Sequence, residues 1–266
     1  MISVITAEIR KNIRRPAFRV GAVLVALLVA LNYGIGLAEL IWPSIAPQGG
    51  LNVATLYPDN FVNSAMGAAG LSSAIAMIVG ALMAGSEFAW GTFKTALTQR
   101  AGRLKTIGGR IATYLLYTAT LTLIIFAMSV LGGTVVAAYE SHAITWPAAI
   151  DVAKGFGAIW LMLSVSGTLG IALGTLFRQP AAAVGVGLVY GLALQVLIVR
   201  FIAGINGGQF KWFANLFEGE NSTALQRSFG GAVSDISAER GVITLLIYVA
   251  AYVVITAALV RQRDVT

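Results

Sequence analysis

The chain has 266 residues, of which 58% are hydrophobic and 11% are charged, and its formal net charge is +7. Soluble domains contain about 25% charged residues, so this composition indicates a membrane protein. The absence of cysteine excludes a disulfide framework and a cysteine metal site, and the single histidine, His142, argues against a histidine metal cluster. The basic residues lie between apolar runs, which favours anionic lipid headgroups over nucleic acid as their counter-charge.

Residues 1–18 are predicted to form an amphipathic elbow helix in the cytoplasmic membrane interface. Isoleucines recur at helical spacing, at Ile2, Ile5, Ile9 and Ile13, while basic residues occupy the other faces. Pro16 is expected to break or bend this helix before the first span. An alternative is that the basic residues only flank and orient that span.

Six apolar segments are long enough to cross a bilayer, which takes about 20 residues per helix. They cover residues 20–40, 61–85, 111–139, 153–177, 180–202 and 241–260. The segments are continuously apolar rather than alternating, which disfavours a membrane β-barrel. The sequence therefore predicts an all-α membrane protein with one transmembrane domain over residues 1–266.

The distribution of charge predicts the orientation of these spans. With the amino terminus inside, thirteen of the 18 basic residues fall on the inner side together with three acidic residues. The positive-inside rule then places both termini in the cytoplasm.

The inner loop at residues 86–110 is basic and begins with an aromatic stripe. The apolar side chains at approximate helical spacing are Phe88, Trp90, Phe93 and Leu97. An apolar face on a short cytoplasmic helix must be covered, so this loop is expected to contact either lipid or a partner protein.

The outer loop at residues 203–240 contains a second aromatic segment. Phe210, Phe213 and Phe217 share one helical stripe, with Trp212 alongside. We expect an aromatic helix that lies at headgroup depth or re-enters the bilayer.

Weakly polar side chains within the spans are candidates for lining a passage. Those selected are Asn32, Ser164, Thr168 and Gln195. Roughly half or more of all such groups are expected to hydrogen-bond to the backbone of neighbouring helices instead. No acidic or basic residue lies deep within a span, which weakens the hypothesis of an ion-coupled carrier.

The sequence argues against two kinds of catalysis, ATP hydrolysis and intramembrane serine proteolysis. The chain contains no Gly-Lys dipeptide and hence no phosphate-binding loop for ATP. An intramembrane serine protease needs a histidine within the membrane to activate its serine, whereas His142 falls in a predicted outer loop.

In layout the whole chain resembles the type-2 ABC permeases, which are the membrane halves of bacterial exporters. The shared features are the amphipathic elbow, six spans, a basic inner loop after the second span and an aromatic outer segment between the fifth and sixth. The likeness is densest at Glu87, Gly91-Thr92, Leu97, Arg100, Arg103 and Gly109-Arg110. The chain departs from the family where "TQRAGR" replaces a turn that often holds Pro and Ser, and where Arg110 replaces a frequent Lys.

The resemblance implies that residues 86–110 form a coupling helix that fits a cleft on a separate ABC ATPase subunit. The coupling residues would be Glu87, Phe88, Trp90, Phe93, Leu97, Arg100 and Arg103. The permease would act as a homodimer or heterodimer with two ATPase copies in the bacterial plasma (inner) membrane. ATP and Mg would be bound by the ATPase, this chain would hold no cofactor of its own, and the cargo would be a drug or antibiotic, a peptide or a lipid.

Two other functions remain open at this point. One is an ion-coupled secondary carrier or channel that works without an ATPase. The other is a membrane anchor or assembly factor that transports nothing.

Overall fold

The computed structural model describes residues 2–42, 44, 53–89, 103–205, 209–231 and 234–262. Within these ranges the backbone forms helices joined by turns and short irregular segments, without any β-strand. The prediction of an all-α chain is therefore confirmed.

The chain begins with two helices separated by a sharp break. Helix α1 covers Ile2–Arg14 and α2 covers Pro16–Ile41. Arg15 between them is extended, with φ −75° and ψ 129°, because a residue that precedes proline is disfavoured in the helical conformation. Pro16 occupies the first helical position, where its missing N–H costs no hydrogen bond. The predicted break is present, and α2 begins a few residues before the predicted span.

Six helical segments are long and apolar enough to cross a membrane, and each contains one of the predicted spans. They are Pro16–Ile41, Pro58–Phe88, Thr106–Tyr139, Ala149–Phe177, Pro180–Gly204 and Ala238–Gln262. The corresponding long helices after α2 are α3 (Phe61–Ala89), α5 (Arg103–Tyr139), α6 (Ala149–Phe177) and α11 (Ala238–Gln262). The fifth segment is composite, with α7 (Pro180–Val189), the π-helix η4 (Tyr190–Leu194) and α8 (Gln195–Gly204).

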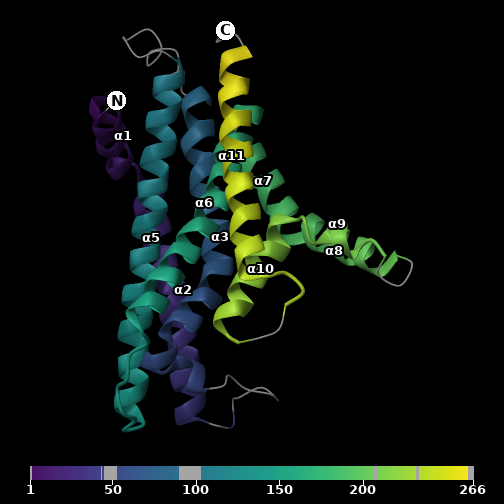
Figure 1. The fold of residues 1–266 in the computed structure, drawn as a ribbon. Coiled ribbons are helices and arrows are strands. Elements are labelled where there is room, and N and C mark those ends of the chain that lie inside the picture. The colour runs from purple at the N-terminus through teal and green to yellow at the C-terminus, as the bar shows by residue number, and fades with distance from the viewer. Residues whose placement is uncertain are drawn as a thin grey trace.

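Shorter helices complete the described part of the chain. Before α3 lie the 3₁₀ helices η2 (Val53–Leu56) and η3 (Pro58–Asn60), and between α8 and α11 lie α9 (Lys211–Ala214) and α10 (Glu218–Phe229). Helix α10 packs against α11 and also contacts α3 and α6. In Figure 1 the long helices form an elongated bundle, α1 and the end of α11 lie at the same end of it, and α8 with α9 projects sideways from the bundle.

The interior of the bundle is apolar and its centre is the pair formed by α3 and α6. A single large cluster of buried side chains joins α2, α3, α5, α6, α10 and α11. Where α3 and α6 cross, glycines bring the backbones into direct contact: a Cβ on Gly170 would overlap the carbonyl oxygen of Met77, and one on Gly174 would lie 2.7 Å from that of Ala81. Small residues of this kind permit the close approach of membrane helices.

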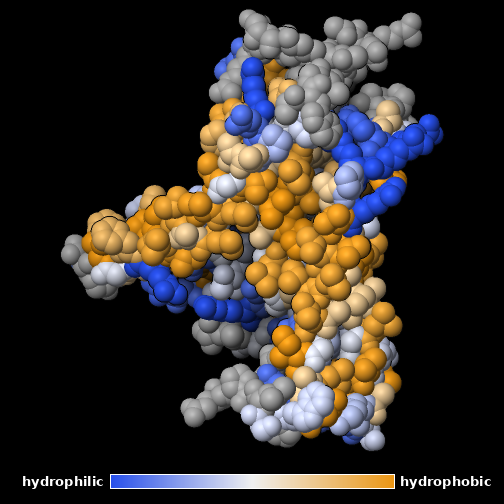
Figure 2. Space-filling view, turned by 180° about the vertical axis from the view of Figure 1, so that it is seen from behind, coloured by the Kyte–Doolittle hydropathy of each residue, from blue (hydrophilic) through white to orange (hydrophobic). Residues whose placement is uncertain are grey.

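The outer surface of the bundle is also apolar over its middle. Large hydrophobic side chains are exposed along several long helices, among them Leu27, Leu31, Leu123, Leu131, Ile247 and Val254. Figure 2 shows hydrophobic residues across the middle of one face, with hydrophilic residues at the end that carries α1 and along the underside of the part that projects sideways. Soluble monomers rarely expose continuous apolar patches of this extent, so the surface agrees with a chain that crosses a membrane several times.

Candidate functional site

The predicted coupling residues lie within, or at the edges of, a segment outside the described residues. Trp90, Phe93, Leu97 and Arg100 lie in residues 90–102, which the structure does not describe. Arg103 is the first residue of α5, and Glu87 and Phe88 lie in the last turn of α3. The end of α3 and the start of α5 therefore flank this segment.

Phe88 packs within the chain. Its half-buried side chain lies against a small apolar cluster formed by Ile107 and Ile111 of α5 and Val260 of α11. The guanidinium carbon of Arg178 lies 5.6 Å from the centre of the Phe88 ring, a distance at which a cation and an aromatic face attract each other. Phe88 thus connects the end of α3 to three other parts of the same end of the bundle.

Glu87 is the centre of a buried cluster of charged side chains. Its carboxylate is 4% exposed, Lys11 Nζ donates to its Oε1 at 2.8 Å, and Arg15 Nη2 lies 3.2 Å from the same oxygen. Arg110 donates to Oε2, and the side chain of Arg110 is only 1% exposed. Lys11 also contacts Glu8 at 2.8 Å. We call Glu8, Lys11, Arg15, Glu87 and Arg110 the Glu87 cluster.

This cluster joins helix α1 to both flanks of residues 90–102. Lys11 belongs to α1, Arg15 to the break before α2, Glu87 to α3 and Arg110 to α5. Arg15 Nη1 also donates to the carbonyl oxygen of Met83 at 3.3 Å, and Asn12 Nδ2 lies 3.5 Å from the sulfur of Met83. Because a buried carboxylate is costly to leave without a partner, these four elements resist being moved independently.

Sequence reasoning assigned Glu87 to contacts with a partner subunit, whereas the structure gives its carboxylate three cationic partners inside the chain. One signal in the sequence indicated that Glu87 pairs with basic residues of its own chain. Glu87 is the only acidic residue in the segment 86–110, which carries five basic residues, and it directly follows an apolar span. An acid in that position is well placed to pair with cations of its own chain.

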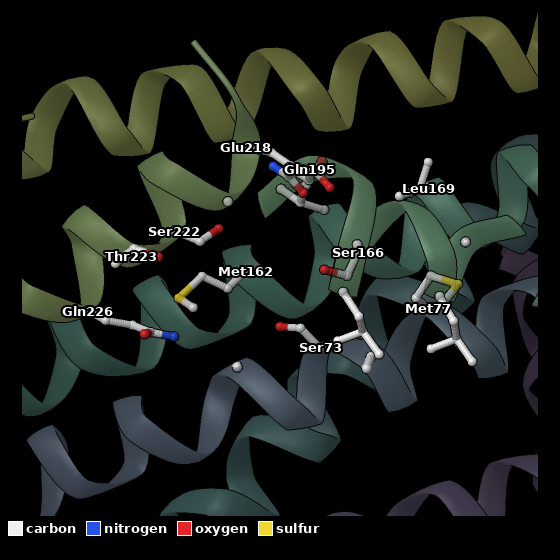
Figure 3. A pocket seen from close by; sticks show the side chains of 18 residues that line it. Ser73, Met77, Met162, Ser166, Leu169, Gln195, Glu218, Ser222, Thr223 and Gln226 are labelled. Atoms are coloured by element: carbon white, nitrogen blue, oxygen red, sulfur yellow. The ribbon is translucent and has the colours of Figure 1, made fainter. Parts of the chain in front are cut away.

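A second site is a cavity of about 230 Å³ between α3, α6, the composite fifth segment and α10. We call it the α10 cavity. The polar side chains that line it are Ser73, Ser166, Gln195, Glu218, Ser222, Thr223 and Gln226. Met77, Met162 and Leu169 supply apolar surface, and Figure 3 shows Met77 and Leu169 toward one side and the α10 residues Ser222, Thr223 and Gln226 toward the other. The lining is therefore amphipathic.

Two buried polar groups of the α10 cavity stand out. Glu218 and Gln195 are 7% and 5% exposed. The hydroxyl of Tyr252 donates to Glu218 Oε2 at 2.8 Å, and Glu218 forms no ion pair with any residue that the structure describes. Glu218 lies in α10, outside the six candidate spans, and burial raises the pKa of its carboxyl to about 7.

Local structure explains how these two groups reach the cavity. Asn221 Nδ2 donates to the carbonyl oxygens of Asn215 and Phe217, at 2.9 and 2.8 Å, which fixes the start of α10 where Glu218 is the first residue. Gln195 follows directly after the π-helix η4, and π-helical turns occur frequently at functional sites. A Cβ on Gly219 would lie 2.8 Å from Gln195 Nε2, so the glycine leaves room for the amide.

The other predicted passage residues lie elsewhere. Ser164 Oγ is hydrogen-bonded to Thr118 Oγ1 at 3.0 Å, and Thr168 Oγ1 donates to the carbonyl oxygen of Ser164 at 2.8 Å, so both hydroxyls are used inside the bundle. Asn32 is exposed on α2. Of the four residues, Gln195 is the one at the α10 cavity. Glu218, which the sequence placed in an outer loop, was missed because no local pattern shows that α10 folds back onto α3, α6 and α11.

The predicted outer aromatic residues lie on and beside α9. The ring centres of Trp212 and Phe213 are 5.7 Å apart, and those of Phe213 and Phe217 are 5.9 Å apart, both in edge-to-face geometry. Phe210, Trp212 and Phe213 are exposed, and α9 belongs to the part that projects from the bundle (Figure 1). Their position at headgroup depth stays a prediction.

The fold thus defines a helical chain with six segments able to cross a membrane, a buried charge cluster at one end and an amphipathic cavity within the bundle. The chain belongs to the family described as "Protein of unknown function (DUF2705)", which matches residues 23–266. A search of curated proteins found no match.

Proposed function

We propose that the chain is the transmembrane permease subunit of a bacterial ABC exporter, located in the plasma (inner) membrane with both termini in the cytoplasm. In this proposal residues 86–110 contain the coupling helix, and a separate ATPase subunit binds that helix, ATP and Mg. The proposal rests on the resemblance to type-2 ABC permeases. The observation that carries it is the Glu87 cluster, because it joins the flanks of the predicted coupling segment to the elbow helix.

Helix α3 provides a route from the coupling segment to the α10 cavity. Glu87 lies in its last turn, while Ser73 and Met77 line the cavity further along the same helix. Because α3 and α6 are in backbone contact at Gly170 and Gly174, they are expected to move as a unit. If the ATPase subunit displaces residues 90–102, the α3–α6 pair would tilt, and the cavity that both helices line would change shape.

A dimer of this chain, or of this chain and a related one, is part of the proposal. ABC permeases act in pairs, with one ATPase copy beneath each permease chain. The projecting α8 (Figure 1), with exposed side chains such as Leu197 and Phe201, offers apolar surface for a second permease chain or for lipid. We expect the purified complex to contain two permease chains and two ATPase copies.

The test is to replace both aromatic side chains predicted to enter the ATPase cleft, in the variant Trp90→Ala with Phe93→Ala. Large buried aromatic side chains contribute about 2 kcal/mol or more each to binding where they act as anchors. We therefore expect ATPase recovery with the tagged permease to fall by at least about tenfold, which corresponds to about 1.4 kcal/mol. The measurements are co-purification of the ABC ATPase expressed with the permease, and ATP-dependent transport in proteoliposomes.

The matched control is Trp212→Ala with Phe213→Ala, which removes an equally large aromatic pair from the α9 region. It should leave ATPase recovery unchanged. Full recovery and full transport by the Trp90 and Phe93 variant would refute the assignment of residues 86–110 to ATPase coupling.

One observation favours a second candidate function, an ion-coupled carrier. The sequence placed no ionisable residue deep within a span, yet the structure buries Glu218 at a cavity between helices. Buried carboxyl groups with a pKa near neutrality are the usual carriers of coupled protons. Transport that persists without any ATPase, driven by a proton gradient and lost in Glu218→Gln, would favour this candidate over the exporter.

A further inference from the structure

The α10 cavity carries chemistry that identifies the kind of ligand it can hold. The carboxyl of Glu218 is buried without an ion-pair partner among the described residues, and one hydroxyl, that of Tyr252, donates to it. The Nε2 donor of Gln195 is buried and has no hydrogen-bond partner in the described part of the chain. A buried polar group without a partner is unfavourable, so a ligand that accepts a hydrogen bond from this amide gains a favourable contact.

We propose that the α10 cavity binds a small amphipathic organic cation. Its positively charged nitrogen would lie against the carboxylate of Glu218, and a neighbouring hydrogen-bond acceptor would be bound by the Nε2 of Gln195. This inference deepens the exporter proposal, on which it rests for the role of the cavity in transport, whereas the binding itself is a property of this chain alone.

The position of the two groups supports one ligand that reaches both. Glu218 is the first residue of α10, and a Cβ added to the next residue, Gly219, would lie 2.8 Å from Gln195 Nε2, so the amide of Gln195 lies close to the start of α10. Both side chains line the same cavity. A ligand that carries a cation and an acceptor a few bonds apart can therefore satisfy the carboxylate and the amide together.

The remaining lining explains the amphipathic character of the ligand and limits its size. Met77, Met162 and Leu169 offer apolar surface, and methionine side chains adapt to ligands of irregular shape. The cavity volume of about 230 Å³ suits a small ligand or one end of a longer one.

The surroundings of Glu218 favour a cation over an anion. The titratable groups that face its carboxyl are the hydroxyls of Tyr190, Tyr248 and Tyr252. Among the described residues no lysine, arginine or histidine lies within ion-pair distance of it. An anionic ligand would therefore meet a like charge without compensation.

Acetylcholine is a suitable probe because it combines a permanent cation with an ester acceptor in a small molecule. Two matched compounds separate these features: 3,3-dimethylbutyl acetate replaces the charged nitrogen by carbon, and pentyltrimethylammonium lacks the ester. We expect acetylcholine to bind the purified chain in lipid nanodiscs at least about tenfold more tightly than the uncharged ester, because its fixed positive charge is attracted to the buried carboxylate of Glu218. Equilibrium dialysis with radiolabelled probes measures all three affinities.

Variants assign the interaction to the two residues. Glu218→Gln should lower acetylcholine affinity by about tenfold or more and leave the uncharged ester unaffected. Gln195→Leu should make acetylcholine and pentyltrimethylammonium bind equally. Glu220→Gln, which removes the other carboxyl of α10 without touching the cavity lining, is the control and should bind acetylcholine as the unchanged chain does.

The unchanged chain provides a test that does not depend on the folding of any variant. Because the carboxyl of Glu218 has a pKa of about 7, it is mostly protonated at pH 6 and mostly ionised at pH 8. Acetylcholine has a fixed charge, so its affinity should rise roughly tenfold between these pH values while that of the uncharged ester stays constant. A flat pH profile, or equal affinity for charged and uncharged probes, overturns the inference.

The outcomes separate this inference from the exporter proposal. Binding with the expected charge and pH dependence, in a chain that recruits no ATPase, would leave the cation site standing and remove the exporter. ATPase recruitment through Trp90 and Phe93, without cation binding, would leave the exporter proposal standing and remove the cation site.

Discussion

Glu87→Gln is expected to lower the free energy of unfolding by about 3–5 kcal/mol, the range found when one member of a buried ion pair is removed. The amide has nearly the same shape as the carboxylate, so the loss is one of charge rather than of packing. Arg110, with a side chain only 1% exposed, would remain buried without its counter-charge. Lys11 and Arg15, which are more exposed, can recover part of their hydration. The measurement is the unfolding curve of the purified chain in mixed micelles of increasing denaturing detergent.

The control for Glu87→Gln is Asp235→Asn, which removes the partner of Lys211. Both side chains of that pair are more than half exposed, so water replaces the lost contact and the unfolding curve should change little. A double variant, Glu87→Gln with Arg110→Gln, removes both buried charges. It should be more stable than the two single effects together predict, because residues in one ion-pair network are coupled. Additive effects, or a Glu87→Gln variant as stable as the unchanged chain, would contradict the structural role given to the cluster.

The six candidate spans could be predicted from the sequence because their signal is local. Each of these helices is apolar over a length that crosses a bilayer, and Pro16 and Pro180 each mark the first residue of a helix. Hydrophobicity and proline geometry depend only on neighbouring residues. For this reason the predicted spans lie inside the observed helices, with differences of a few residues at their ends.

The charge cluster could be predicted only in part. An acid at the end of an apolar segment, close to several basic residues, indicates that Glu87 needs a partner. Which cations reach it depends on tertiary structure, since Lys11 lies 76 residues away from it and Arg110 lies 23 residues away. Sequence periodicity carries no information on contacts between elements so distant in the chain.

The α10 cavity was the least predictable feature. Segment 218–229 is polar and reads as a solvated outer loop, yet it packs against α3, α6 and α11 and buries Glu218. Polarity alone indicates exposure, and only the arrangement of the surrounding helices turns this polar helix into the wall of a cavity. The weakly polar residues Ser164 and Thr168 illustrate the opposite case, because their hydroxyls are used within the bundle.

The second large effect is expected from Gly170→Leu, at the crossing of α3 and α6. A side chain on Gly170 would overlap the carbonyl oxygen of Met77 and approach the backbone nitrogen of Ala81 to 2.9 Å. These are backbone atoms, so the clash cannot be relieved by a change of rotamer and the two helices must separate. Forcing extra volume into a packed core costs about 1–3 kcal/mol and occasionally more. We expect a cost of at least about 3 kcal/mol here, because separation of the helices also disrupts two other close approaches of their backbones, that of Gly80 to Gly167 and that of Gly174 to Ala81.

Gly157→Leu is the matched control, since Gly157 belongs to the same helix and a Cβ added to it would have nothing within 4 Å. It makes the same chemical change in α6, so any cost that comes only from replacing glycine within this helix cancels in the comparison. Thermal unfolding in detergent should separate the two variants clearly. A third variant, Gly170→Ala, tests the route from the coupling segment to the cavity. If α3 and α6 transmit motion as a unit, Gly170→Ala, a milder change, should reduce transport while ATPase binding through Trp90 and Phe93 is kept. Equal stability of Gly170→Leu and Gly157→Leu would mean that α3 and α6 do not cross in backbone contact, and the transmission of motion along that pair would have no structural basis.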